Sequence, residues 1–88
     1  MTNREICLKA AQRLREVGWR QGGIGGKDGP HCMLGACMWV TRYHATDVAA
    51  FGAAYTAAYA AAYTTAIAWN DTPGRTTEEV IAALEACP

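Results

Sequence analysis

Apolar residues recur along this chain at the three- and four-residue spacing of an α-helix, and no stretch reads convincingly as a strand. The first such pattern covers about residues 3–17, with apolar side chains on one face and charged side chains on the other. Thr2-Asn3-Arg4-Glu5 has the form of a capping box at its start, and Gly18 is placed to end it. We therefore expect an amphipathic first helix whose ends are set by local chemistry.

The second pattern, about residues 31–43, is apolar on almost every side. A short helix of this kind is typical of the centre of a domain, because it needs cover all round. Pro30 stands where a helix can begin, since the N–H that proline lacks would have no helical partner there. The sequence therefore predicts a buried helix directly after the Gly29-Pro30 pair.

The third pattern is the longest, about residues 47–65, and Thr46 or Asp47 can cap it. Its aromatic residues recur every four positions with alanines between them, and they are Phe51, Tyr55, Tyr59 and Tyr63. This ridge has two interpretations. Either the rings pack into the core with their hydroxyl groups at its edge, or they stand on the surface as an interface, where tyrosine supplies contact area at low entropic cost.

The end of the chain predicts a turn followed by a last helix. Asp71-Thr72-Pro73-Gly74 has the composition of a turn, and Thr76-Thr77-Glu78-Glu79 is a second capping box. The last helix is expected at about residues 77–86. Together the four patterns predict one all-α domain over residues 1–88, a compact bundle of four helices with a glycine-rich loop between the first and second.

Charge narrows the choice of partner. The formal net charge of zero argues against a nucleic-acid-binding protein, which needs a basic surface. Residues 1–44 hold seven basic and three acidic residues, and residues 45–88 hold one basic and five acidic residues. The two halves either complement each other within one fold or form a dipolar surface for a charged partner. Because large apolar side chains are few, self-association or a protein partner would add stability.

Nothing in the sequence predicts a membrane partner or export. No apolar run reaches the ~18 residues that a membrane span needs. The first residues lack the basic-then-apolar order of a signal peptide, and four cysteines without such a signal are typical of reduced thiols. We therefore expect a cytoplasmic protein.

The stretch from Gly18 to Gly35 carries seven of the nine glycines and most of the residues that could do chemistry. It matches neither common nucleotide motif. Asp28 stands where a P-loop needs Ser or Thr, and also where the dinucleotide motif needs its last glycine. What remains is the general ability of a glycine loop that leads into a helix N-terminus to hold an anion.

A metal site and a catalytic thiol are the other chemical hypotheses. Four side chains have the right type for a metal: His31, Cys32, Cys37 and His44. A Cys-x4-Cys spacing points two sulfurs far apart on a helix, so no metal and no other cofactor is expected. Cys32 would lie in the first turn of a helix, where the dipole lowers a thiol pKa, with His31 or His44 as base and Asn70 or Asp71 as orienting group. No catalytic motif is complete, so we do not expect an enzyme.

Several short motifs follow one another in order: Gly18-Trp19, Gly29-Pro30-x-Cys32, Gly35-Ala36, Trp69-Asn70-Asp71 and Thr77-Glu78-Glu79-Val80. In this order the sequence resembles a small domain family of unknown function from actinobacteria and their phages, over nearly the whole chain. The resemblance implies a bacterial or phage cytosolic context and no activity. It also suggests that Trp19 and Trp69-Asn70-Asp71 come together, with Asn70 or Asp71 bonding N–H groups of the loop between residues 20 and 32.

The sequence thus favours a small non-enzymatic protein-interaction module. If the chain is phage-encoded, we expect a phage accessory protein that binds a host protein in the host cytoplasm. Self-association as a homodimer is the other form of interaction. The expected contact residues are Trp19, Lys27, Tyr55, Tyr59 and Tyr63. The alternative is a small-ligand or anion-binding domain, or an unrecognised enzyme, that uses the glycine-rich loop. That site would be lined by His31, Cys32, Asn70 and Asp71.

Overall fold

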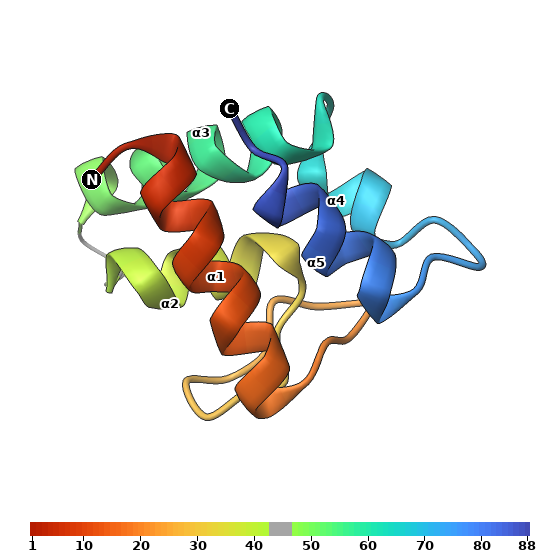
Figure 1. Cartoon of the computed structure of the whole chain (residues 1–88). Helices are drawn as coiled ribbons and strands as arrows, with labels where there is room; N and C mark the ends of the chain where they lie inside the picture. Colours follow the sequence, from red (N-terminus) through yellow and green to blue (C-terminus); the bar gives the residue numbers. More distant parts are fainter. Residues whose placement is uncertain (43–46) are drawn as a thin grey trace.

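The computed structural model of the chain describes residues 1–42 and 47–88, and this part is helical without a strand (Figure 1). Its helices are α1 (Asn3–Val17), α2 (Met33–Thr41), α3 (Val48–Ala62), α4 (Ala66–Asn70) and α5 (Thr77–Glu85). The all-α prediction is confirmed. α1 and α3 have 15 residues each and α2 and α5 have nine each, and the five-residue α4 is an addition to the four expected helices, so the predicted four-helix bundle is not confirmed. No helix among the described residues has the length and hydrophobicity needed to cross a membrane.

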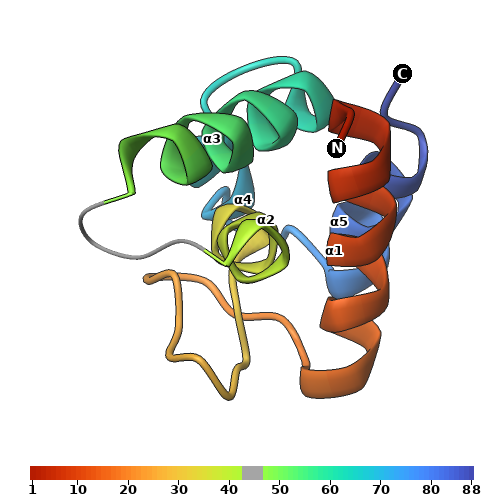
Figure 2. The same ribbon diagram turned by 90° about the vertical axis from the view of Figure 1, so that its left-hand side faces the viewer.

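α2 lies at the centre of the molecule. Figure 2 shows α3 on one side of it and the glycine-rich loop on the other, with α1 and α5 alongside. α2 packs against α1, α3 and α4. Every residue from Met33 to Met38 is buried, so the expectation of a central, all-round apolar helix is confirmed.

Both predicted capping boxes form. At the start of α1 the Glu5 N–H donates to Thr2 Oγ1 at 3.1 Å, and the Thr2 N–H donates to Glu5 Oε1 at 2.8 Å. Thr76 and Glu79 make the same pair of bonds at the start of α5. Gly18 ends α1 with a φ of 92°, a conformation that suits glycine. These ends follow from neighbouring residues alone, which is why the sequence predicts them.

The start of α2 differs from the prediction. Pro30 does not begin the helix; instead, the backbone at His31 is extended and pairs with Trp19 in a parallel bridge. The His31 N–H donates to the Gly18 carbonyl at 3.2 Å, and the Arg20 N–H donates to the His31 carbonyl at 3.0 Å. Cys32 is therefore the N-cap and not a first-turn residue, and its sulfur accepts from the Gly35 N–H at 3.3 Å.

α3 ends three residues before the predicted limit, because Tyr63 adopts a left-handed backbone with a φ of 59°. Residues 66–70, which lie between the predicted long helix and the predicted turn and were assigned to neither, form the separate α4. Asp47 caps α3 by accepting from the Ala50 N–H at 2.9 Å. The expected end of the second helix at Tyr43 and the alternative cap Thr46 lie outside the described residues.

The core is built from small side chains and thiols. The buried residues of α3 are all alanines: Ala54, Ala57, Ala58, Ala61 and Ala62. All four cysteines are buried and unbridged. Cys7 donates to the Ala57 carbonyl at 3.3 Å, and hydrogen bonding with Cys37, followed by burial, raises its pKa. Burial, followed by hydrogen bonding with the neighbouring Cys7 thiol, raises the pKa of Cys87 to about 11. Cys7 and Cys87, near opposite ends of the chain, therefore lie close together as free thiols without a disulfide.

Candidate functional site

The side-chain amide of Asn70 is fully buried at the end of α4 and joins three segments. Its Oδ1 accepts from Trp19 Nε1 at 2.6 Å and from the Met33 N–H at 2.9 Å. Its Nδ2 donates to the Arg20 carbonyl at 3.1 Å and to Asp71 Oδ1 at 3.0 Å. One amide thus holds the beginning of the loop, the first residue of α2 and the end of α4 together.

Asp71 extends this junction into the loop. Its Oδ1 accepts from the Gly22 N–H at 3.1 Å, as the motif-based hypothesis expected of Asn70 or Asp71. The hydrogen bond from Asn70, followed by the one from Gly22, holds the pKa of Asp71 below its ordinary value. Trp19, Asn70 and Asp71 therefore act together as an anchor for the loop.

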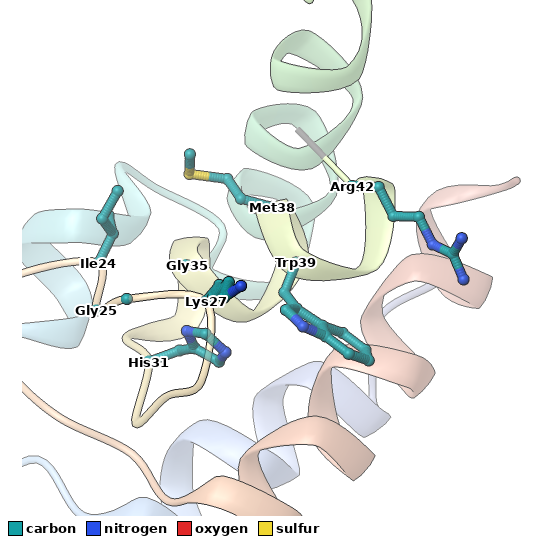
Figure 3. A pocket seen from close by; sticks show the side chains of 9 residues that line it. Ile24, Gly25, Lys27, His31, Gly35, Met38, Trp39 and Arg42 are labelled. Carbon is teal, nitrogen blue, oxygen red and sulfur yellow. The ribbon is translucent and has the colours of Figure 1, made fainter. Parts of the chain in front are cut away.

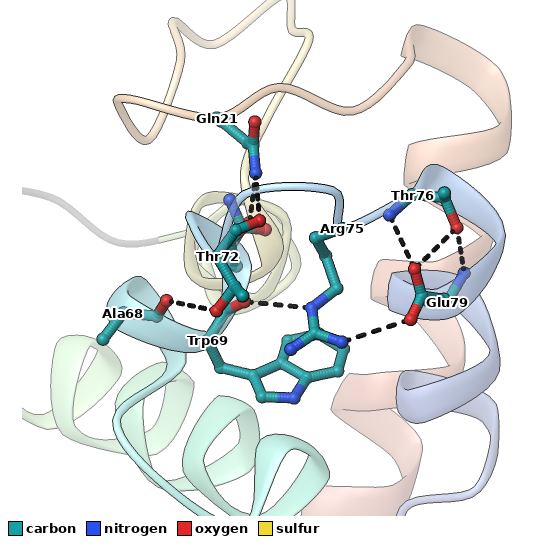
Figure 4. A network of polar contacts seen from close by, with 8 residues as sticks. Gln21, Ala68, Trp69, Thr72, Arg75, Thr76 and Glu79 are labelled. Atoms are coloured by element: carbon teal, nitrogen blue, oxygen red, sulfur yellow. Dashed lines mark hydrogen bonds and ion pairs between the residues drawn. The ribbon is translucent and has the colours of Figure 1, made fainter.

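The turn between α4 and α5 is tied to the same junction (Figure 4). Gln21 Nε2 donates to the Asn70 carbonyl at 3.1 Å and to the Thr72 carbonyl at 2.9 Å. The Arg75 guanidinium stacks 3.9 Å from the centre of the Trp69 ring and donates from Nε to the Trp69 carbonyl at 3.1 Å. These contacts order a turn that carries few apolar residues.

Arg13 fixes the other side of the loop. Its Nε donates to His31 Nε2 at 3.2 Å, and its Nη2 donates to the Lys27 carbonyl at 2.7 Å. The guanidinium also stacks 4.0 Å from the centre of the Trp39 ring. A single residue of α1 therefore joins the loop to α2.

Two glycines are required where the loop runs against other backbone. A Cβ atom on Gly35 would lie 2.0 Å from the Ile24 carbonyl oxygen, and one on Gly25 would lie 1.9 Å from the Pro30 carbonyl oxygen. Gly25 also has a φ of 81°. The loop can therefore lie directly on the first turns of α2.

A pocket of about 510 Å³ opens between this loop and the outer side of α2 (Figure 3). Its lining residues are Ile24, Gly25, Gly26, Lys27, His31, Gly35, Met38, Trp39 and Arg42. The lining includes two residues that the sequence analysis named as candidates: Lys27 as a partner contact and His31 as part of a ligand site. The residues from α2 were missed, because only the return of the loop across α2 brings them to the same place.

The His31 side chain is buried, at 2% exposed. Burial, with a smaller contribution from the Arg13 charge, lowers the pKa of the imidazole, while the Ile24 backbone opposes this shift. Because Arg13 donates to Nε2, the neutral ring carries its proton on Nδ1. Nδ1 is buried and has no hydrogen-bond partner of acceptable geometry among the described residues.

The other residues proposed for a ligand or catalytic site lie elsewhere. Cys32 is 4% exposed, and burial raises the pKa of its thiol, which is the opposite of what a nucleophile needs. Asn70 directs its amide to the bonds of the loop anchor, and Asp71 bonds Gly22. Neither residue lines the pocket, and nor does Cys32. His44, the alternative base and metal ligand, lies outside the described residues.

Within residues 1–42 and 47–88, no group of three or more His, Cys, Asp or Glu side chains is arranged to hold a metal ion. The candidate donors are separated: Cys37 lies in the core, and the His31 ring meets Arg13. The described side chains therefore supply hydrogen bonds and positive charge, and no metal-ligand set.

The outer face of α3 is a second exposed surface. The aromatic ridge points away from the core: Phe51 and Tyr55 are each 38% exposed, Tyr59 is 49% exposed and Tyr63 is 76% exposed. No charged residue occurs between Asp47 and Asp71. Of the remaining expected contact residues, Lys27 is exposed, whereas Trp19 is half-buried with its indole N–H bonded to Asn70.

Comparison with known proteins assigns the chain to a sequence family. No curated protein and no solved structure shows a significant match to the chain. The sequence model of a family of unknown function, DUF6197, matches residues 1–87, which is nearly the whole chain. That span includes the loop anchor, the pocket and the exposed face of α3. The chain therefore belongs to this family of unknown function.

Proposed function

We propose that this protein is a small interaction module that pairs with a second copy of itself through the outer face of α3. The observation that carries the proposal is the exposed ridge of Tyr55, Tyr59 and Tyr63 on a helix without charged residues. Soluble proteins usually place charged side chains on the exposed side of a surface helix. An aromatic, uncharged exposed face is typical of an interface, where tyrosine is enriched.

The chemistry of the face favours a second copy as the occupant. An uncharged ridge offers no electrostatic feature that would select a charged partner. Two copies related by a two-fold axis present the same ridge to each other, and the rings can enter the spaces above the small alanine residues between them. The 15 residues of α3 span about 22 Å, so the interface belongs to the smaller, transient class.

Self-association is tested by measuring mass against concentration. Sedimentation equilibrium should show a rising average mass between about 10 µM and about 1 mM, as expected for a weak dimer. Tyr59→Glu should remain monomeric, because pairing would bury a charge without a partner. Leu8→Glu is the matched control, because Leu8 is 41% exposed on α1 and Tyr59 is 49% exposed. The control should pair like the unmodified chain.

The sedimentation result decides whether a second copy or a different protein binds the ridge. A chain that stays monomeric over the whole range, or a Tyr59→Glu variant that pairs as well as the control, rules out the self-associating function. Binding of a different protein, such as a host protein if the chain is phage-encoded, would then be the use of the ridge. That outcome would contradict our proposal of a second copy.

A further inference from the structure

The pocket beneath the glycine-rich loop has a different character on each side. Ile24, Met38 and Trp39 form an apolar wall. The other side carries the Lys27 ammonium and the His31 imidazole, and Figure 3 shows Lys27 between Gly25 and Trp39 with His31 next to it. Among the described residues that line the pocket there is no Asp or Glu. An apolar wall beside positively charged and N–H donors suits an anion with an apolar body.

His31 gives an independent reason to expect a ligand oxygen. The Arg13 Nε–H can only donate, so His31 Nε2 must accept and the proton of the neutral ring lies on Nδ1. This Nδ1 is buried and makes no well-aligned hydrogen bond among the described residues. The Ile24 backbone is near enough to act as a weak acceptor and to raise the pKa of the ring, but it is not aligned well enough to satisfy the N–H fully. Buried polar groups in folded proteins are nearly always satisfied by protein, water or ligand. An oxygen atom in the pocket would satisfy this one.

We propose that this pocket binds a small organic acid, with the carboxylate between Lys27 Nζ and His31 Nδ1–H and the apolar body against Ile24, Met38 and Trp39. Arg42 also lines the pocket, but Figure 3 shows its guanidinium directed away from Lys27 and His31. One ammonium and one N–H donor therefore meet at this side, which matches the single charge and two oxygens of a carboxylate better than the double charge of a phosphate. The volume of about 510 Å³ is typical of small-molecule sites. The site is separate from the proposed pairing face, because α2 stands between α3 and the loop (Figure 2).

Phenylacetate is a suitable probe for this site, and phenylacetamide, an uncharged analogue of nearly the same shape, is its control. NMR titration of the full-length, ¹⁵N-labelled chain should show shifts in loop and α2 amides with phenylacetate, at a dissociation constant on the order of millimolar. Phenylacetamide should bind about tenfold more weakly, because it lacks the charge. Equal binding of the two probes, no shift with either at about 50 mM, or shifts confined to other helices would each overturn the proposal.

Paired lysine variants separate a specific contact from general attraction. Lys27→Met removes the proposed cation, and Lys9→Met removes the same charge from α1, outside this pocket. Lys27→Met should weaken phenylacetate binding about five- to tenfold, and Lys9→Met should change it by less than about twofold. Both side chains are exposed, so far-UV circular dichroism should show the same fold for both variants. Equal weakening by the two variants would refute the contact with Lys27.

The protonation state of His31 is a second readout that does not depend on a variant of the site. Long-range ¹⁵N–¹H NMR should find the Nδ1–H form in the free protein, and its Nδ1 signal should move as phenylacetate saturates the pocket. Only one other histidine, His44, is present, so His44→Gln assigns the signals. An Nε2–H form, or an Nδ1 signal unmoved by saturating phenylacetate, would overturn the proposal.

Discussion

Asn70→Ala tests whether one buried amide holds the glycine-rich loop on the helices. The change removes the acceptor of the Trp19 and Met33 N–H groups. Met33 is fully buried, so its N–H loses its partner without gaining water, at about 1–3 kcal/mol. The half-buried Trp19 N–H regains some water and adds about 1 kcal/mol. We expect a loss of about 3 kcal/mol, a large part of the roughly 4–13 kcal/mol usual for a domain of 88 residues.

Urea unfolding, followed by circular dichroism and tryptophan fluorescence, measures this loss. Asp71→Asn is the matched control, because Asp71 bonds the same loop but is exposed to solvent. We expect the control to lose less than about 1 kcal/mol, since water can replace its bonds. If Asn70→Ala loses no more than the control, the loop does not depend on the buried amide and the reasoning is refuted.

Asn70→Asp separates the two halves of the amide. The new carboxyl group keeps an acceptor for Trp19 and Met33 but sets an oxygen against the Arg20 carbonyl and the Asp71 carboxylate. Burial and the like charge should raise the pKa of the new group above its unfolded value. The folded state then binds more protons, so this variant should gain stability relative to the unmodified chain as the pH falls from 7 to about 5. A constant difference across that range would contradict the assignment of Nδ2 as a donor.

Three further measurements test the loop, the start of α2 and the interior of α3. Burial lowers the pKa of His31 below its ordinary 6.5, so its contribution to stability is present above that pH and is lost as the pH falls, which urea unfolding between pH 7 and about 5 should show. Gly35→Ala should destabilise by about 1–3 kcal/mol in thermal unfolding, because its Cβ meets the Ile24 carbonyl, whereas Gly52→Ala, with open space in α3, should stabilise by about 0.5–1 kcal/mol. Cys32, whose pKa is raised by burial, should react with iodoacetamide at pH 7.5 far more slowly in the native chain than in urea, and equal rates would contradict its burial.

Features set by neighbouring residues could be predicted. The Thr2–Glu5 and Thr76–Glu79 capping boxes join residues three positions apart, so the motif contains both partners. Gly18 ends α1 for the same local reason. The central place of α2 also follows from composition, because a helix without a polar side has to be covered on all sides.

Features that depend on distant residues could not be predicted by such local rules. The bridge between Trp19 and His31 holds the backbone extended where Pro30 alone suggested a helix start, and this moved Cys32 out of the helix. The role of Asn70 was anticipated only through the order of the family motifs. Neither its burial nor its bond to Met33, 37 positions away, has a local signal. The pocket likewise needs Lys27 and His31 of the loop to meet Met38 and Trp39 of α2.

The two faces of α3 show where sequence and tertiary structure divide. The sequence by itself determined a long helix with aromatic residues on one ridge and alanines elsewhere, and both faces are apolar enough to be buried. Hydrophobicity therefore could not decide which face turns inward. Tertiary packing decided it: the alanines let α1 and α2 approach α3 closely, and the larger rings were left outside.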